Sequence, residues 1–246
     1  MRSYAIGDIH GHLEKLRAAH DLVAADRARM GDDTARIVHV GDLVDRGPDS
    51  SGVIDYLASG QAAGEPWIVL KGNHDRMFEY FLRGERDPAL KADFTYLHDR
   101  IGGVETLLSY GVAANPWQRP DIAREEALKA VPEAHLAFLT ALPAWHLEGE
   151  VLFVHAGIRP GVDLTQQTET DMIWIRDAFL DDTRDHGALV VHGHSPVDAA
   201  THYGNRINID SGAAYGGPLS AIVLEGREAF LLTPEGRVAL TPQTLP

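Results

Sequence analysis

Carboxylate, imidazole and carboxamide side chains recur beside glycine at five points in this chain. The five segments are Gly7-Asp8-Ile9-His10-Gly11, Gly41–Gly47, Gly72–Asp75, His155-Ala156-Gly157 and Gly193-His194. Their functional groups suit divalent ions such as Mn²⁺, Fe²⁺ or Zn²⁺, and the flanking glycines allow the backbone to turn so that side chains point inward. If the segments converge, we expect them to form a site that holds divalent metal ions.

This prediction rests on the recurrence of the pattern at five places, because no single residue would support it. An aspartate after a strand is more often a turn former or a helix N-cap, and a lone histidine is more often structural. Taken alone, Asp8 or His155 would therefore be interpreted as a structural residue. We give this structural interpretation to three further histidines: His39, His192 and His202. Five strand ends that repeat one pattern are difficult to explain by turn chemistry.

Spacing suggests how the ligands are shared. Asp8 and His10 lie two positions apart, so both would face one side and bind one ion if strand geometry continues. Asp42 has two carboxylate oxygens and could bridge two ions. Because the chain has no cysteine, disulfides, thiolate metal sites and thiol catalysis are excluded.

Short apolar runs must position these residues. Each run stops at a glycine-containing turn and is rich in β-branched residues, which indicates buried strands. The runs are Tyr4–Ile6, Ile37–Val40, Trp67–Leu70, Val151–Val154, Ala188–Val191 and Ile207–Ile209. In open α/β sheets ligands bind beyond the carboxyl ends of strands, so the five segments could meet at one site.

Helical patterns separate the early strands and place the chain in the α/β class. Apolar residues spaced by three or four predict a helix over 12–30, and similar patterns predict helices over Asp49–Ala63 and His74–Leu82. The C-terminal part instead shows three antiparallel strands joined by short turns, at Ser220–Leu224, Ala229–Thr233 and Arg237–Leu240.

We expect a single domain over residues 1–246, because this length suffices for one sizeable core. Residues 84–140 interrupt the strand rhythm and are mostly helical in pattern, so we interpret them as an insertion packed over one edge. Substrate choice could lie there and in residues 195–218. Four aromatic residues of these stretches could line a pocket, but buried packing is the favoured interpretation of each: Tyr96, Trp117, Tyr203 and Tyr215.

Composition limits the class of partner. The 246 residues carry 22 basic and 36 acidic side chains, which gives a net charge of −14. Because this average field repels a phosphate-rich polymer, we expect no nucleic-acid partner. The chain contains no run of about 18 apolar residues, so we expect no membrane partner. The first residues lack the apolar segment of a secretory signal, and we expect a cytoplasmic protein.

In order and content, the five segments resemble the motif series of the calcineurin-like metallophosphoesterases: GDxHG, GDxxDRG, GNH(D/E), HAG and GH. The DRG element is similar to the phosphoprotein phosphatase branch, above all to the small bacterial and lambda-phage-type Ser/Thr phosphatases. The resemblance implies a metallophosphoesterase fold, with two β-sheets packed face to face as a sandwich flanked by helices. Periodicity alone does not distinguish this fold from a single doubly wound sheet.

The resemblance implies six metal ligands for two divalent ions: Asp8, His10 and Asp42 for the first, and Asp42, Asn73, His155 and His194 for the second. A hydroxide bridging the two ions would attack phosphorus in line. We expect manganese, with iron or zinc as alternatives.

Four further residues would complete the catalytic set. Arg46 matches the motif arginine that grips the phosphate, and Arg176 resembles the second phosphate-binding arginine of the bacterial enzymes. An exposed helix charge is the alternative for Arg176. His74 matches the family's general acid, and Asp45 matches the carboxylate that orients it. We expect Asp75 to support neighbouring groups.

The predicted function is a metal-dependent phosphoester hydrolase, with a phosphorylated protein or a small phosphoester as substrate and phosphoserine or phosphothreonine as the first candidate. A symmetrical bis(5′-nucleosyl)-tetraphosphatase, which cleaves Ap4A to ADP, would share all the metal ligands. Asp45 favours the protein phosphatase, because the tetraphosphatases often replace that acid, whereas Asp75 favours the tetraphosphatase. A non-catalytic binding scaffold is disfavoured, because every expected ligand is present.

Overall fold

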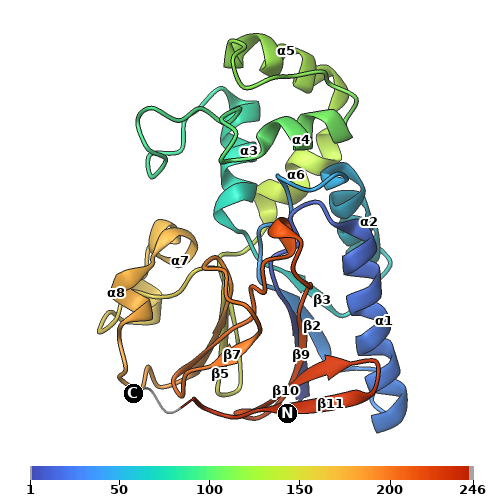
Figure 1. Cartoon of the computed structure of the whole chain (residues 1–246), viewed down its shortest axis with the longest axis vertical. Helices are drawn as coiled ribbons and strands as arrows, with labels where there is room; N and C mark the ends of the chain where they lie inside the picture. The colour runs from blue at the N-terminus through green and yellow to red at the C-terminus, as the bar shows by residue number, and fades with distance from the viewer. Residues whose placement is uncertain (1, 244–246) are drawn as a thin grey trace.

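The computed structural model describes residues 2–243 and contains two β-sheets with helices on their outer sides (Figure 1). The first sheet has six strands, in the order β11 (Gly236–Leu240), β10 (Glu228–Thr233), β9 (Ala221–Glu225), β1 (Arg2–Ile6), β2 (Arg36–His39) and β3 (Trp67–Val69). The second has five, in the order β4 (Trp145–Glu148), β5 (Val151–Val154), β6 (Leu189–His192), β8 (Arg206–Asn208) and β7 (Thr201–His202).

Strand direction sets where polar loops can gather. Strands β1, β2 and β3 are parallel to one another, and so are β5, β6 and β8. The carboxyl ends of each parallel group therefore lie along one edge of its sheet. Strands β9, β10 and β11 extend the first sheet by antiparallel pairing, as the sequence pattern predicts.

Apolar side chains from both sheets meet in one buried cluster. Val38 and Ile222 of the first sheet lie in it together with Phe153 and Val191 of the second. Burial of each such side chain is worth roughly 1.5–3 kcal/mol. The shared cluster shows that the sheets pack face to face, so the predicted α/β sandwich is confirmed.

Two helices cover the outer face of the first sheet, α1 (Leu13–Met30) and α2 (Ser50–Ala62), and a third, α3 (Asn73–Arg83), extends beyond its end (Figure 1). Leu16 of α1 packs with Tyr4 of β1 in the cluster on this face. Asp49 caps α2 by accepting a hydrogen bond from the Gly52 N–H, and Gly31 ends α1 in the left-handed conformation that glycine adopts readily. All three helices agree with the prediction to within one residue at each end.

Two short helices pack against the outer face of the second sheet: α7 (Glu169–Trp174) and α8 (Asp177–Leu180). Ile173 and Phe179 bury their side chains there against Val154 and Val190. None of the described helices combines the length and apolarity needed to cross a bilayer.

Residues 84–140 contain a long loop, α4 (Gly103–Ser109), α5 (Pro120–Ala130) and most of α6 (Glu133–Ala141). They lie beyond the end of the first sheet, next to α3 (Figure 1). Tyr96 and Leu107 from this segment share a buried cluster with Leu57 of α2. The mostly helical character agrees with the sequence pattern, while the extent of a single domain over residues 1–246 stays a prediction.

Candidate metal centre

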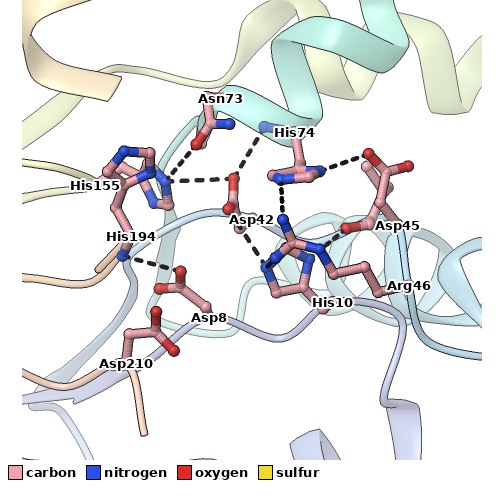
Figure 2. Close-up of polar contacts among 12 residues, drawn as sticks. Asp8, His10, Asp42, Asp45, Arg46, Asn73, His74, His155, His194 and Asp210 are labelled. Carbon is pink, nitrogen blue, oxygen red and sulfur yellow. Dashed lines mark hydrogen bonds and ion pairs between the residues drawn. The ribbon is translucent and has the colours of Figure 1, made fainter. Parts of the chain in front are cut away.

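Loops from both sheets bring the predicted ligands together (Figure 2). The six residues come from five loops: Asp8 and His10 after β1, Asp42 after β2, Asn73 at the start of α3, His155 after β5 and His194 after β6. Because parallel strands end at the same edge of a sheet, the two sheets present these loops to one shared space.

The turn after β1 differs from the geometry that the spacing predicts. Strand β1 ends at Ile6, and His10 has a φ of 45°, so strand alternation does not orient Asp8 and His10. That argument for their common direction is wrong, because the chain turns at this point. The two side chains still line one cavity, and the His10 N–H donates to the Asp42 backbone oxygen at 2.8 Å, which fixes the turn against the next loop.

Asp42 lies between two groups of candidate ligand atoms. Its Oδ2 is 3.4 Å from His10 Nε2, and its Oδ1 is 3.3 Å from His155 Nε2. The trio His10–Asp42–His74 and the trio Asp42–His155–His194 each keep their ligand atoms within 4.8 Å of one another. Such an arrangement can hold two divalent ions that share Asp42.

Asp8 and Asn73 lie beside these trios. Asn73 Oδ1 is 3.0 Å from His155 Nε2, and Asp8 Oδ2 accepts a hydrogen bond from the His194 N–H at 2.9 Å. Asp8 Oδ1 and His194 Nε2 are buried and have no hydrogen-bond partner within residues 2–243. Because buried polar atoms without partners are costly, these two atoms and the oxygen and nitrogen donors around them fit divalent cations.

Backbone strain is concentrated in the same loops. Among the described non-glycine residues, those with φ in the left-handed region all belong to this site: His10 (45°), Asp42 (49°), Asp45 (74°), Arg46 (71°) and His194 (66°). Each such residue costs of order 1–3 kcal/mol. The loops pack too closely for an added side chain, since a Cβ on Gly47 would lie 1.9 Å from the His10 carbonyl oxygen. The surrounding structure therefore fixes the direction of these side chains.

His74, a member of the first trio, also forms a buried pair with Asp45. His74 Nδ1 donates to Asp45 Oδ2 at 2.7 Å, and Asp45 is completely buried. The Nε2 atom of His74 consequently faces the cavity, where Arg46 Nη2 donates to it at 2.9 Å. Arg46 Nη1 donates to His10 Nε2, also at 2.9 Å. The guanidinium and the imidazole can both reach one ligand in the cavity.

Arg176 lines the same cavity as Arg46 from the other sheet. It is solvent-exposed, directly precedes α8, and its Nη1 donates to Ser195 Oγ at 3.0 Å. Two guanidinium groups converging on one cavity match the geometry and charge of a phosphate.

Burial and mutual repulsion shape the charges of the site. Burial raises the pKa of Asp8 well above its ordinary value, and Asp210 and Asp42 raise it further. Burial also raises the pKa of Asp210 to about 6 and lowers the pKa values of His10 and His155. Burial opposes ionisation of Asp42, but the histidines around it hold its pKa below the ordinary value. Neutral imidazoles and clustered carboxylates are suited to divalent cations.

Two further residues line this cavity: Asp210, which sequence reasoning missed, and Tyr215, which the sequence offered as a pocket residue. Asp210 follows β8 and precedes Ser211-Gly212, so it repeats the signal of a polar residue beside glycine after a strand. Tyr215 is 67% exposed and its ring centre lies 5.3 Å from the Arg46 guanidinium. The buried-packing interpretation is therefore wrong for this tyrosine, as it is for Trp117, which is 90% exposed. His39, His192 and His202 are buried away from the cavity, as the structural interpretation predicts.

Arg76 links three parts of the chain behind the site. It lies on α3, and its Nε and Nη2 donate to the two carboxylate oxygens of Asp87 at 2.8 and 3.0 Å. Its Nη1 donates to Glu169 and Thr170 at the start of α7. The helix that begins with Asn73 is therefore joined both to residues 84–140 and to the segment that leads to Arg176.

Asp75 supports the neighbouring turns, as its sequence position predicts. Its carboxylate accepts hydrogen bonds from the Leu43 N–H at 2.9 Å and the Gly72 N–H at 2.8 Å. Burial, with a contribution from Asp42, raises the pKa of Asp75 to about 8. The residue therefore ties the loop after β2 to the start of α3.

The sequence of this chain is similar to a known family and to named relatives. Residues 1–223 match the model of a family described as calcineurin-like phosphoesterase. The asymmetrical bis(5′-nucleosyl)-tetraphosphatase PrpE of Anoxybacillus flavithermus is 26% identical over 98% of this chain and 94% of its own length. That of Geobacillus thermodenitrificans is 26% identical over 88% of each chain.

Solved structures share the fold at low identity. A putative diadenosine tetraphosphatase aligns over 98% of this chain and 94% of its own, with a TM-score of 0.63 and 21% identity. A cold-active protein tyrosine phosphatase of a psychrophilic Shewanella aligns over 98% of this chain and 80% of its own, with a TM-score of 0.61 and 16% identity. At this level of identity the structural similarity shows a common fold and does not identify a substrate.

Proposed function

Since the chain belongs to the calcineurin-like phosphoesterase family and is a phosphoester hydrolase, we propose that it hydrolyses phosphate monoesters of alcohols, with phosphoserine and phosphothreonine in proteins as substrates. The observation that carries this proposal is the buried His74–Asp45 pair next to Asp42, the carboxylate that lies between the two groups of candidate ligands. An alkoxide is a poor leaving group, and an oriented imidazole that protonates it is most valuable for such a substrate.

The proposed ligands divide between two ions. Asp8, His10 and Asp42 would hold the first, and the second would be held by Asp42 with three further residues: Asn73, His155 and His194. When bound, two divalent ions supply Lewis acidity, which favours ionisation of water at neutral pH and neutralises charge on phosphoryl oxygens. We propose manganese, with iron or zinc as alternatives.

The chain's own residues would orient the phosphate and move the proton. Arg46 and Arg176 would bind its non-bridging oxygens, because guanidinium groups donate paired hydrogen bonds that match phosphate. In the described structure His74 Nε2 accepts from Arg46, so the imidazole would first take up a proton there as Arg46 turns to the phosphate. His74 would then donate that Nε2 proton to the departing oxygen, while Asp45 keeps Nδ1 engaged and the ring fixed. Since the chain has no cysteine and water is the attacking group, we expect no phosphoenzyme intermediate.

A second candidate is hydrolysis of a dinucleoside tetraphosphate. One relative named as an asymmetrical tetraphosphatase aligns with 98% of this chain at 26% identity. In addition, Tyr215 offers an exposed ring over Arg46 on which a nucleobase can stack. The symmetrical reaction predicted from the sequence remains a form of this candidate.

The test combines metal analysis of the purified protein with one activity panel. The panel contains p-nitrophenyl phosphate, phosphoserine and phosphothreonine peptides, Ap4A and bis-p-nitrophenyl phosphate, each with added Mn²⁺. We expect bound divalent metal and the highest kcat/KM on the phosphopeptides. Faster cleavage of Ap4A would favour the second candidate, with AMP and ATP as products of the asymmetrical reaction and ADP alone of the symmetrical one. A metal-free protein inactive on every substrate would indicate a binding scaffold.

A further inference from the structure

Asp45 is held by side chains that lie outside every metal-binding loop. We propose that Tyr96 and Thr106, from residues 84–140, are positioning residues for His74: they fix the Asp45 carboxylate, which in turn directs His74 Nε2 toward the leaving group. This inference rests on the proposed role of His74 as the proton donor. It gives residues 84–140 a part in the reaction that no motif in them indicates.

Hydrogen bonds account for both oxygens of Asp45. Oδ2 accepts from His74 Nδ1 at 2.7 Å, while Oδ1 accepts from Tyr96 Oη at 2.5 Å and from Thr106 Oγ1 at 2.7 Å. Asp45 and Thr106 are fully buried, and Tyr96 is 6% exposed. Because hydrogen bonds in a buried, low-dielectric setting are strong, the two donors on Oδ1 prevent the carboxylate from rotating away from His74.

The same segment holds the backbone of the turn that carries Asp45. The Asp45 N–H donates to Thr106 Oγ1 at 2.8 Å and to Ser50 Oγ at 3.1 Å, and the Arg46 N–H donates to the Gly102 carbonyl at 3.1 Å. Both Asp45 and Arg46 have φ values above 70°, a strained conformation that needs such support. Thr106 Oγ1 accepts from the backbone N–H of Asp45 and donates to its side chain, so one hydroxyl holds both parts of this residue.

Tyr96 packs against α3, the helix that carries His74. Its ring stacks on two phenylalanines of α3, with ring centres 5.7 Å from Phe78 and 4.8 Å from Phe81. Burial, together with Asp45, raises the pKa of Tyr96 well above its ordinary value, so the hydroxyl remains a donor. The Tyr96 side chain is therefore held both by the helix of His74, through ring packing, and by Asp45, through its hydroxyl.

Tyr110 provides a matched control in the same segment. Its ring also packs against Phe78, with a centre-to-centre distance of 5.9 Å, and its hydroxyl is 2.9 Å from His135 Nδ1. It has no hydrogen bond to Asp45 in the described structure. Tyr96→Phe and Tyr110→Phe thus each remove one hydroxyl beside Phe78, but only the first removes a contact to Asp45.

The experiment compares leaving groups in the metal-loaded full chain. Phenyl phosphate releases a phenolate with a pKa of about 10, which needs protonation, whereas 2,4-dinitrophenyl phosphate releases a much better leaving group. We expect Tyr96→Phe and Thr106→Val to lower kcat on phenyl phosphate about tenfold, a fraction of the ~10²–10⁴-fold that general acids contribute. KM, bound metal and kcat on the dinitrophenyl ester should change less than about twofold, and Thr106→Ser should restore kcat on phenyl phosphate.

The outcomes separate this inference from the proposed function. His74→Ala should show the same selectivity for the poor leaving group, more strongly. If it does and Tyr96→Phe behaves like Tyr110→Phe, with equal effects on both substrates, the positioning role is wrong and the proposed acid stands. If His74→Ala shows no selectivity, the acid assignment and this inference both fail. Should Tyr96→Phe not fold, as judged by thermal denaturation, the Thr106→Val and Thr106→Ser pair decides.

Discussion

The strand-end loops and residues 84–140 contribute to the same site by different physical means. The loops carry the candidate ligands, and sheet pairing delivers them: β1, β2 and β3 run parallel, so Asp8, Asp42 and Asn73 emerge at one edge. Residues 84–140 contribute Tyr96 and Thr106, which reach Asp45 because helices and a loop pack against α3. One region is placed by backbone hydrogen bonds and the other by side-chain packing.

This difference teaches where each kind of residue can be found. A ligand at a strand end leaves a local signature, because the turn needs glycine and the ion needs particular side chains. A supporting residue leaves none, because any segment that packs at the right distance can supply a hydroxyl. The two regions should therefore respond differently to substitution, with metal loss in the first and loss of alignment or stability in the second.

The largest expected effect is at the residue shared by both trios. Asp42→Asn should lose bound metal and lower kcat by at least about 10³-fold, because metal ions supply several kcal/mol of transition-state stabilisation. Metal content and kcat on p-nitrophenyl phosphate measure this. Asp55→Asn, at an exposed carboxylate of α2, is the control that should leave both unchanged. A metal-replete, active Asp42→Asn enzyme would contradict the shared-ligand assignment.

The next effect concerns the ion pair that joins α3 to residues 84–140. Arg76→Met leaves the buried Asp87 without its partner, which should lower the free energy of unfolding by about 3–5 kcal/mol. Urea denaturation measures the loss. Arg159→Met is the control: Arg159 pairs with Asp171 at a side chain 56% exposed, and the expected change is below about 1 kcal/mol. Equal effects would mean that residues 84–140 are not anchored through Arg76.

A smaller effect should follow from a single methyl group. Gly102 and Gly111 both have positive φ values, 83° and 77°, so an alanine at either is strained by about 1 kcal/mol. Only at Gly102 would the Cβ meet another part of the chain, 2.5 Å from the Arg46 backbone nitrogen. Gly102→Ala should lower kcat roughly tenfold with metal retained, whereas Gly111→Ala should change only stability. If the two variants had similar kinetics, the proposal that residues 84–140 support the turn of Asp45 and Arg46 would be contradicted.

The smallest effect is a pH dependence of stability that arises from β2, the strand that precedes the shared ligand Asp42. His39 lies on β2, and burial with its neighbour His20 lowers its pKa to about 3. The unfolded chain, with a histidine pKa of about 6.5, binds more protons between these values, so stability is full above pH 6.5 and falls as pH falls. His39→Gln should reduce the slope of unfolding free energy between pH 6.5 and 5 by up to about 1.4 kcal/mol per pH unit. An unchanged slope in urea denaturation would contradict this assignment.

Much of the fold was predictable because buried strands and amphipathic helices have periodic sequences. The runs that became β1, β2, β5 and β6 are continuous and apolar, and each ends at a glycine. Strands β4 and β7 were not predicted. Strand β4 alternates exposed and partly exposed residues at a sheet edge, and β7 has only two residues, so neither produces an apolar run. Helices α7 and α8 are too short for a helical period to be evident.

The candidate site divides in the same way. The ligands and the His74–Asp45 pair could be proposed from motifs, although their geometry depends on left-handed turns that the spacing of Asp8 and His10 did not reveal. Tyr96 was interpreted as a core residue, and its burial agrees with that. Its hydroxyl reaches a carboxylate 51 residues away in sequence, and contacts at such separation have no periodic signal.

The position of Asp42 between the sheets has a thermodynamic consequence. Asp42 follows a strand of the first sheet and His155 follows a strand of the second, and the His155 ring also bonds to the Val40 carbonyl across the sandwich. An ion held by both side chains would act as a cross-link between the sheets, present only in the folded chain. Ligands that bind only the folded state add RT ln(1 + [L]/Kd) to its stability. The concentration of free metal would then affect the free energy of unfolding of the protein as well as its catalytic activity.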